Sequence, residues 1–177
     1  LRPSGINEPW VLAAIASLPR EEFVPAPMRA SAYTDRAIPL GDGRFLAAPL
    51  VHARMLSEAA PTLQDTALLV GDAGGYLAAL LSPLVATLDT ASPADVAAGA
   101  ATGSYTLILV DGAAEQLPEA LTALLADNGR IVTGISERGV TRLARGRRIA
   151  GKVSLVSVAD MGVPVIPEFA APKGWSF

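Results

Sequence analysis

The sequence has no cysteine and only one histidine, His52. The absence of cysteine excludes disulfides, zinc sites with thiolate ligands and a cysteine nucleophile. With a single histidine, a metal site built from several imidazoles is impossible, and a Ser-His-Asp hydrolase would have to be built around His52. A surface or packing role is favoured for this side chain over a catalytic one.

Aromatic residues make up only 5% of the chain, although 51% of its residues are hydrophobic. We therefore expect a core of Leu, Val, Ile and many small contacts. The formal net charge is −3, with both signs mixed along the chain, which argues against a nucleic-acid partner. Apolar runs are much shorter than the roughly 20 residues of a membrane span. No charged and then apolar leader precedes Ile6, so we expect a cytoplasmic protein without a membrane partner.

The length of 177 residues suits one domain. We expect residues 1–60 to hold N-terminal helices and a substrate loop, and residues 61–177 to form a sheet domain. A helix is predicted over 10–18, started by Asn7 and Pro9, and a second from Pro49 to about Ala60. Proline and glycine between them predict loops and short elements over 20–48.

From residue 66 onward, short apolar runs alternate with helical segments. This order predicts an α/β fold with a doubly wound, mostly parallel sheet. Residues 90–104 predict only a loop or weak helix, so the fold is shortened in the middle. Strands are expected over 66–70, 85–88, 105–110, 130–134, 152–158 and, at an edge, 163–169; helices are expected over 76–81 and over 118–126, the latter ended by Gly129.

A glycine-rich turn with Gly71, Gly74 and Gly75 follows the first of these strands and precedes a helix. Ligands bind at the carboxyl ends of strands in such sheets, where glycine permits positive φ and close approach. Asp89, at the next strand end, is in the place from which an acid binds ribose hydroxyls. The alternative is that the glycines make a tight turn and Asp89 caps the next segment.

Two further acids lie at strand ends. Asp72 is in the glycine turn, where it could meet a ligand amine or, as is favoured, cap the following helix. Asp111 follows an apolar strand and is equally compatible with a ligand contact and with a turn residue before Gly112.

Several stretches together resemble the protein-L-isoaspartate O-methyltransferase family. They are PREEFVP at residues 19–25, AYTDRAIPLG at 32–41, ARM at 53–55, the pattern of Gly71, Gly75 and Tyr76, and NGR at 128–130. The resemblance implies a Rossmann-like methyltransferase fold with an N-terminal helical extension. It also implies S-adenosylmethionine as cofactor and methyl transfer to isoaspartyl carboxylates of a damaged protein or peptide.

The sequence departs from this family at one cleft. The family's Ser-Gln-Pro is replaced by Ala47, Ala48 and Pro49, so no hydroxyl or amide can orient a carboxylate there. In the cofactor loop, Leu69 replaces an acid and Ala73 replaces a glycine, and a "GDG" turn is missing from the shortened region. We therefore expect no catalytic residue at Ala47, activity that is reduced or lost, and S-adenosylmethionine binding that is weakened or lost. The remaining candidate cofactor-binding residues are Gly71, Asp72, Gly74, Gly75, Asp89 and Asp111.

Three alternatives stay open. A divergent subfamily could replace the lost contacts with others, for instance from Asp72 or Asp111. The chain could instead be a non-catalytic binding or self-assembling scaffold, because an exposed sheet edge could be covered by a second copy in a homodimer. A different small ligand could also occupy the cleft.

Two features lie outside this cleft. A basic cluster follows residue 137, and a solvated helix end is favoured for it over an anion or partner contact. It consists of Arg138, Arg142, Arg145, Arg147 and Arg148. Trp175 and Phe177 are expected to pack on the sheet as a C-terminal clasp.

Overall fold

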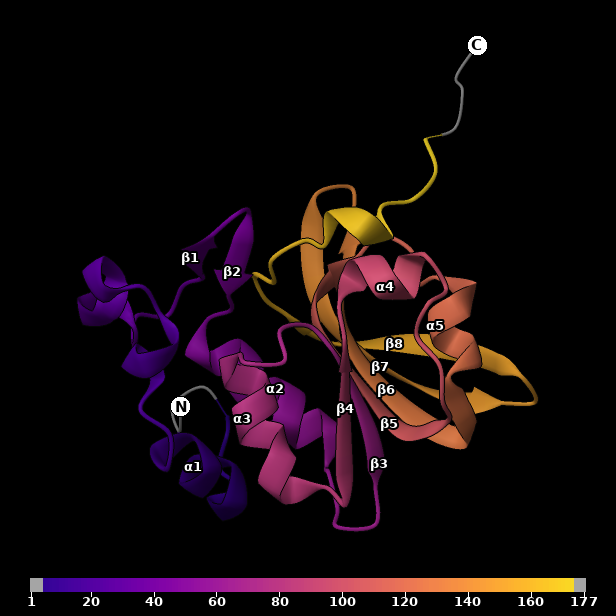
Figure 1. Cartoon of the computed structure of the whole chain (residues 1–177), viewed down its shortest axis with the longest axis horizontal. Coiled ribbons are helices and arrows are strands. Elements are labelled where there is room, and N and C mark those ends of the chain that lie inside the picture. The colour runs from indigo at the N-terminus through magenta and orange to yellow at the C-terminus, as the bar shows by residue number, and fades with distance from the viewer. Residues whose placement is uncertain (1–4, 174–177) are drawn as a thin grey trace.

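A computed structural model describes residues 5–173 of the chain; Trp175 and Phe177 lie outside this range. A six-stranded sheet with the order β4-β3-β5-β6-β7-β8 forms the centre, and a small hairpin, β1-β2, stands apart from it (Figure 1). The strands are β1 (Ile38–Gly41), β2 (Arg44–Leu46), β3 (Thr66–Val70), β4 (Thr87–Ala91), β5 (Tyr105–Ala114), β6 (Leu125–Glu137), β7 (Val140–Ile149) and β8 (Lys152–Asp160). The α-helices are α1 (Pro9–Ala16), α2 (Pro49–Ala59), α3 (Tyr76–Leu81), α4 (Pro93–Ala97) and α5 (Glu119–Ala123).

The sheet is parallel in its first half. Strands β4, β3, β5 and β6 pair in parallel, whereas β7 and β8 complete the sheet as antiparallel hairpins. The buried runs of β3 and β5 are continuous, as parallel strands covered on both faces require. The predicted α/β fold with a doubly wound, mostly parallel sheet is confirmed.

Helices cover both faces of the sheet. Leu69 and Leu109 point to one face and pack with α1, α2 and α3 in the larger core cluster. Leu68 and Ile108, their neighbours along the strands, point to the other face and pack with α4 and α5. The N-terminal extension therefore contributes directly to the core on one face of the sheet.

The two N-terminal helices were predicted, but one start signal was wrong. Helix α2 begins with Pro49 in its first turn and ends at Ala60, whose φ of 42° is left-handed. Helix α1 begins at Pro9 after Glu8, and Asn7 does not cap it. The backbone N–H of Asn7 instead donates to the Glu8 carboxylate, and Glu8 also accepts from Ser57 on α2.

The shortened middle of the fold is confirmed. Between β4 and β5, the structure has only α4 and an irregular connection over 98–104, so β4 forms the edge of the sheet. The second strand was predicted too early, since it runs from Thr87 to Ala91. Asp89 is consequently an interior strand residue and does not lie at the strand end.

Three predictions in the C-terminal half were wrong. Helix α5 ends at Ala123 because β6 begins at Leu125, and Gly129 lies within β6 and does not cap a helix. The segment 163–169 makes only one bridge, Ala113 with Val165, and then a 3₁₀ turn, because its two prolines lack ladder donors.

The basic cluster lies on strand β7 and the turn before it. The predicted helix end at this place was wrong. Turns at Arg138-Gly139 and Ala150-Gly151, all four residues with positive φ, set β7 between its two neighbours. Most of its arginines are paired locally: Arg142 with Asp160, Arg145 with Glu58, and Arg148 with the carbonyl of Leu125. These arginines therefore hold β7 to its neighbours β6 and β8 and to helix α2.

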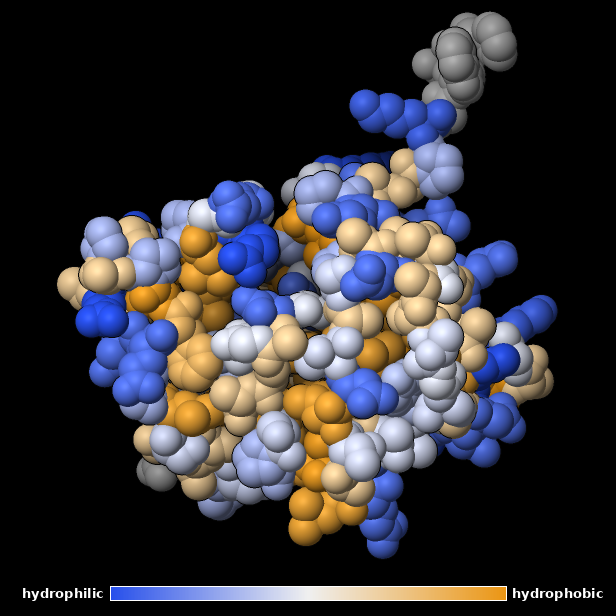
Figure 2. Space-filling view, viewed as in Figure 1, coloured by the Kyte–Doolittle hydropathy of each residue, from blue (hydrophilic) through white to orange (hydrophobic). Residues whose placement is uncertain are grey.

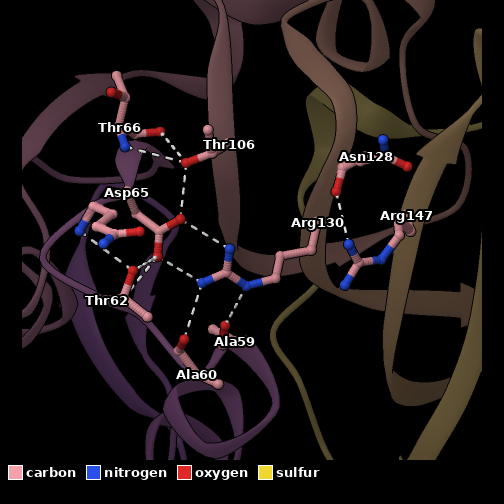
Figure 3. Close-up of polar contacts among 10 residues, drawn as sticks. Ala59, Ala60, Thr62, Asp65, Thr66, Thr106, Asn128, Arg130 and Arg147 are labelled. Carbon is pink, nitrogen blue, oxygen red and sulfur yellow. Dashed lines mark hydrogen bonds and ion pairs between the residues drawn. The ribbon is translucent and has the colours of Figure 1, made fainter.

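A polar cluster joins α2 to the amino ends of the sheet strands (Figure 3). The Arg130 guanidinium on β6 donates to the carboxylate of Asp65 and to the carbonyls of Ala59 and Ala60. The hydroxyl of Thr106 on β5 also donates to Asp65. The left-handed end of α2 is thereby fixed against three strands.

Gly134 on β6 is expected to tolerate no side chain. A Cβ there would lie 2.7 Å from the Gly112 carbonyl oxygen and 2.8 Å from the Ala113 Cα, both backbone atoms of the neighbouring strand. Gly134→Ala should lower the free energy of unfolding by about 1–3 kcal/mol in urea titrations, because the central strands must separate. Gly162→Ala is the control, since a Cβ there meets nothing within 4 Å; equal effects of the two substitutions would contradict the close approach.

Within residues 5–173, no helix is long and apolar enough to span a membrane.

Candidate functional site

The glycine turn lies at the carboxyl end of β3, between that strand and α3. The N–H of Gly71 donates to the Ala91 carbonyl of β4 at 3.0 Å. None of the three glycines has positive φ. Close approach explains two of them, because a Cβ on Gly71 would lie 3.1 Å from the Asp111 Cβ and one on Gly75 would lie 3.1 Å from Asp72. Ala73 also lacks positive φ, so an alanine in place of the family's glycine introduces no backbone strain.

Asp72 stabilises the turn and links it to the β1-β2 hairpin. Its Oδ1 accepts from the Gly74 N–H at 2.9 Å, and its Oδ2 pairs with Arg44 on β2 at 3.1 Å. The residue that caps α3 is Gly75. The prediction that Asp72 caps the helix is wrong in detail, although its carboxylate does bind a backbone N–H of the turn.

A cavity of about 430 Å³ opens beside the turn, between α3 and β4. Its lining residues are mostly small and include Gly74, Gly75, Ser82 and Thr90. Asp89 does not line it, and its carboxylate accepts a hydrogen bond from the Tyr105 hydroxyl at 2.9 Å. Because the side chains of a strand alternate between faces, Thr90 is turned to the cavity where the sequence predicted Asp89.

A larger groove of about 760 Å³ lies between the N-terminal part of the chain and the segment after β8. One wall of the groove is formed by Phe45, Ala48 and Leu50, and the other by Val163 and Val165. In the space-filling view, the surface is hollowed between the β1-β2 hairpin and α4 (Figure 2). The groove is therefore mainly apolar, with charges at its rim from residues such as Arg36 and Asp160.

Ala47 precedes this groove and does not face it. Its side chain is buried, and its carbonyl accepts a hydrogen bond from the Arg20 guanidinium. The position that holds a serine in the resembling family thus carries a methyl group within the core, without any hydrogen-bonding atom.

A buried polar chain connects the N-terminal part to the carboxyl end of β5. The Arg20 guanidinium lies 3.4 Å from His52 Nδ1, and His52 Nε2 lies 2.9 Å from Asp111 Oδ1. Arginine can only donate, so Nδ1 accepts and the Nε2–H donates to Asp111. Arg20 and His52 are fully buried, whereas the Asp111 side chain is 19% exposed. The sequence favoured a surface or packing role for His52; its burial fits the packing alternative and excludes the surface one, and its link to Asp111 was missed.

The environment of Arg20 is polar and aromatic. Its Nε donates to the Ala32 carbonyl at 2.7 Å, and its guanidinium lies 5.0 Å from the centre of the Tyr76 ring. Burial lowers the pKa of Arg20, and the nearby Tyr76 and Asp111 oppose that shift. Sequence spacing could not reveal this arrangement, because Arg20, His52 and Asp111 are far apart in the chain.

The candidate site residues therefore separate into two groups. Gly71, Asp72, Gly74, Gly75 and Asp111 meet beside the carboxyl end of β3. Asp111 was expected directly after a strand or in a turn before Gly112, but it lies within β5, which continues to Ala114. Asp89 lies apart from this group, and its carboxylate is hydrogen-bonded to the Tyr105 hydroxyl. Among the described residues, no group of three or more His, Cys, Asp or Glu side chains could hold a metal ion.

Comparisons with known proteins agree with the sequence motifs. The sequence model of the family described as "Protein-L-isoaspartate(D-aspartate) O-methyltransferase (PCMT)" matches residues 1–92. A protein-L-isoaspartate O-methyltransferase of Koribacter versatilis is 34% identical over 192 aligned positions, covering 94% of this chain and 86% of that protein. One of Methanoregula boonei is 33% identical over 161 positions, covering 77% and 74%.

A solved structure supports the fold. The crystal structure of a Plasmodium falciparum protein-L-isoaspartate O-methyltransferase in complex with S-adenosyl-L-homocysteine superimposes with a TM-score of 0.75, at 17% identity and over 95% of both chains.

Proposed function

The chain belongs to the protein-L-isoaspartate O-methyltransferase family, and we propose that it transfers a methyl group from S-adenosylmethionine to isoaspartyl carboxylates of proteins or peptides, at a reduced rate. One observation carries this proposal. The glycine turn after β3 borders the small cavity beside α3 and β4, and its Asp72 pairs with Arg44, the neighbour of Phe45 in the wall of the apolar groove. A nucleoside and a peptide side chain would thus meet from two directions.

The residues beside the glycine turn fit such a cofactor. The turn takes a conformation that Ala73 adopts without strain, and the adjoining cavity is lined by small residues. Thr90 offers a hydroxyl on the β4 side, where Asp89 is bound to Tyr105. Leu69 is fully buried in the core and offers no acceptor. The nucleoside contacts are therefore fewer than the resembling family's motifs imply.

The reduced rate follows from the lack of a polar side chain at Ala48, the residue of the substituted pair that lines the groove. Bound S-adenosylmethionine supplies an already activated methyl group, so the protein's task is mainly to align the acceptor carboxylate. Ala47 has no hydrogen-bonding side chain, and the neighbouring Ala48 presents only a methyl group to the groove. The acceptor carboxylate is held by shape and by rim charges, which orient it less well.

Calorimetry and a methyl-transfer assay test the proposal together. S-adenosylhomocysteine is expected to bind at micromolar concentration, and an isoaspartyl peptide should be methylated slowly, whereas its aspartyl counterpart should not. Ala48→Gln, which places an amide at a position that lines the groove, should raise the rate by about ten-fold or more, since one hydrogen bond in the transition state contributes about 1–3 kcal/mol. Failure of the wild-type protein to bind at millimolar ligand would overturn the proposal.

A scaffold function is the second candidate, and the exposed β4 edge is the observation in its favour. Strand β4 pairs only with β3, so its outer backbone groups are open to pairing with a second copy. If the chain is a scaffold, we expect a dimer that does not bind S-adenosylhomocysteine. A gel-filtration mass near that of the 18.2 kDa chain would exclude self-assembly. The cytoplasmic location expected from the sequence stays a prediction.

A further inference from the structure

Asp111 has one carboxylate oxygen held by the protein and one that is not. Its Oδ1 accepts from His52 at 2.9 Å. Its Oδ2 takes part in none of the hydrogen bonds found among residues 5–173, and it lies 3.9 Å from the point where a Cβ on Gly71 would be. The side chain is partly exposed. The free oxygen is therefore directed over the first glycine of the turn.

The position of Asp111 lies between the two hollows of the site. Its Cβ packs against Gly71, from which the chain turns towards the small cavity. Two residues further along β5, Ala113 exchanges backbone hydrogen bonds with Pro164 and Ile166, and Pro164 lines the apolar groove. Asp111 therefore contacts the turn beside the cavity and lies two residues from the strand position that is bonded to the groove wall.

The buried chain behind Asp111 ends in a cation. His52 donates to Oδ1 and is itself held by the Arg20 cation, so positive charge lies behind the carboxylate. An ionised carboxylate only accepts hydrogen bonds, and its strongest partners are cations. The free oxygen thus suits a ligand ammonium better than a hydroxyl or a carbonyl.

We propose that Asp111 binds the ammonium group of the cofactor's amino-acid part, with His52 as the positioning residue that orients its carboxylate. This inference rests on the proposed function. It assigns to β5 a charge contact that the buried Leu69 of β3 cannot make.

The test compares two ligands in calorimetry. S-adenosylhomocysteine has the ammonium group, whereas 5′-methylthioadenosine lacks the whole amino-acid part. Asp111→Asn keeps the shape and an acceptor for His52, so the fold should be retained. The substitution should weaken S-adenosylhomocysteine binding by about ten- to hundred-fold, the range of a charge-assisted hydrogen bond, and change methylthioadenosine binding less than about two-fold. Asp127→Asn, an exposed acid at the opposite end of the sheet, should change neither.

His52 is tested by a pair of variants. His52→Leu removes the donor to Asp111 and should weaken S-adenosylhomocysteine relative to methylthioadenosine. His52→Gln, which can donate an amide N–H, should restore a large part of that difference. A purely structural role would weaken both ligands alike in His52→Leu and would overturn the positioning role.

The outcomes separate this inference from the proposed function. Unchanged S-adenosylhomocysteine binding in Asp111→Asn, with normal binding by the wild type, overturns only the role of Asp111. Absence of binding by the wild type overturns both. Should Asp111→Asn not fold, the wild-type protein still decides, since equal affinities for the two ligands would show that the ammonium group makes no contact.

Discussion

Replacing Asp65 with alanine is expected to lower the free energy of unfolding by about 3–5 kcal/mol, the range for breaking a buried ion pair. The carboxylate is 4% exposed and receives five hydrogen bonds (Figure 3). Two come from the Arg130 guanidinium, at 2.9 and 2.6 Å. Without Asp65, that guanidinium keeps only the carbonyls of Ala59 and Ala60 and is left without a counter-charge.

Urea titration of the Asp65→Ala variant measures this loss, and Asp160→Ala is the matched control. Asp160 also pairs with an arginine, Arg142, at 2.8 Å, but its side chain is 84% exposed. Exposed pairs contribute about 0–1 kcal/mol, so the control should remain close to the wild type. Similar losses in the two variants would show that the Asp65 pair is not stabilised by its burial.

The pH dependence gives a second readout of the same pair. Burial acts to raise the pKa of the Asp65 carboxyl, but hydrogen bonds from Arg130, Thr62 and Thr106 outweigh it and hold that pKa well below its ordinary value. A depressed folded-state pKa gives stability that is present above the unfolded value of about 3.9 and is lost as the pH falls towards the folded value. The stability difference between wild type and Asp65→Asn should therefore narrow below about pH 4. A constant difference down to pH 2 would contradict the depressed pKa.

The sequence was sufficient for the elements that are specified locally. Continuous apolar runs gave β3 and the start of β5, and Pro49 gave the start of α2. It was insufficient for elements whose conformation depends on contacts with distant parts of the chain. The run Val140–Ile149 contains four arginines and looks unlike a buried strand, yet it lies between β6 and β8 because its charges find partners on neighbouring elements.

The candidate site divides in the same way. The glycine turn is encoded in consecutive residues, and its place after β3 was predictable. The role of Asp89 was not, since β4 continues to Ala91, which makes Asp89 an interior residue, and the alternation of side chains turns Thr90 to the cavity. The Arg20–His52–Asp111 chain joins three separate segments through side chains, and no spacing rule brings such residues together.

Replacing Arg20 with methionine is expected to cost about 3–5 kcal/mol of unfolding free energy. The side chain is 1% exposed and donates to the carbonyls of Ala32 and Ala47. Methionine fills a similar volume, but it leaves both carbonyls without their donor and removes the partner of His52 Nδ1. It also removes the cation that lies over the Tyr76 ring. The substitution would then remove the side chain that links the N-terminal segment, the loop before α2 and, through His52, strand β5.

Two arginine controls make the Arg20 experiment decisive. Arg29→Met changes an exposed arginine in the 3₁₀ turn Ala26–Ser31 and should alter stability by less than about 0.5 kcal/mol. Arg20→Lys keeps the charge but not the planar fork that reaches two carbonyls and the imidazole, so its stability should lie between those of the wild type and Arg20→Met. If the lysine variant equals the wild type in urea titration, charge alone holds the three segments together. If Arg20→Met unfolds no more easily than Arg29→Met, the buried guanidinium does not stabilise the fold, and the link from the N-terminal segment to Asp111 has no energetic weight.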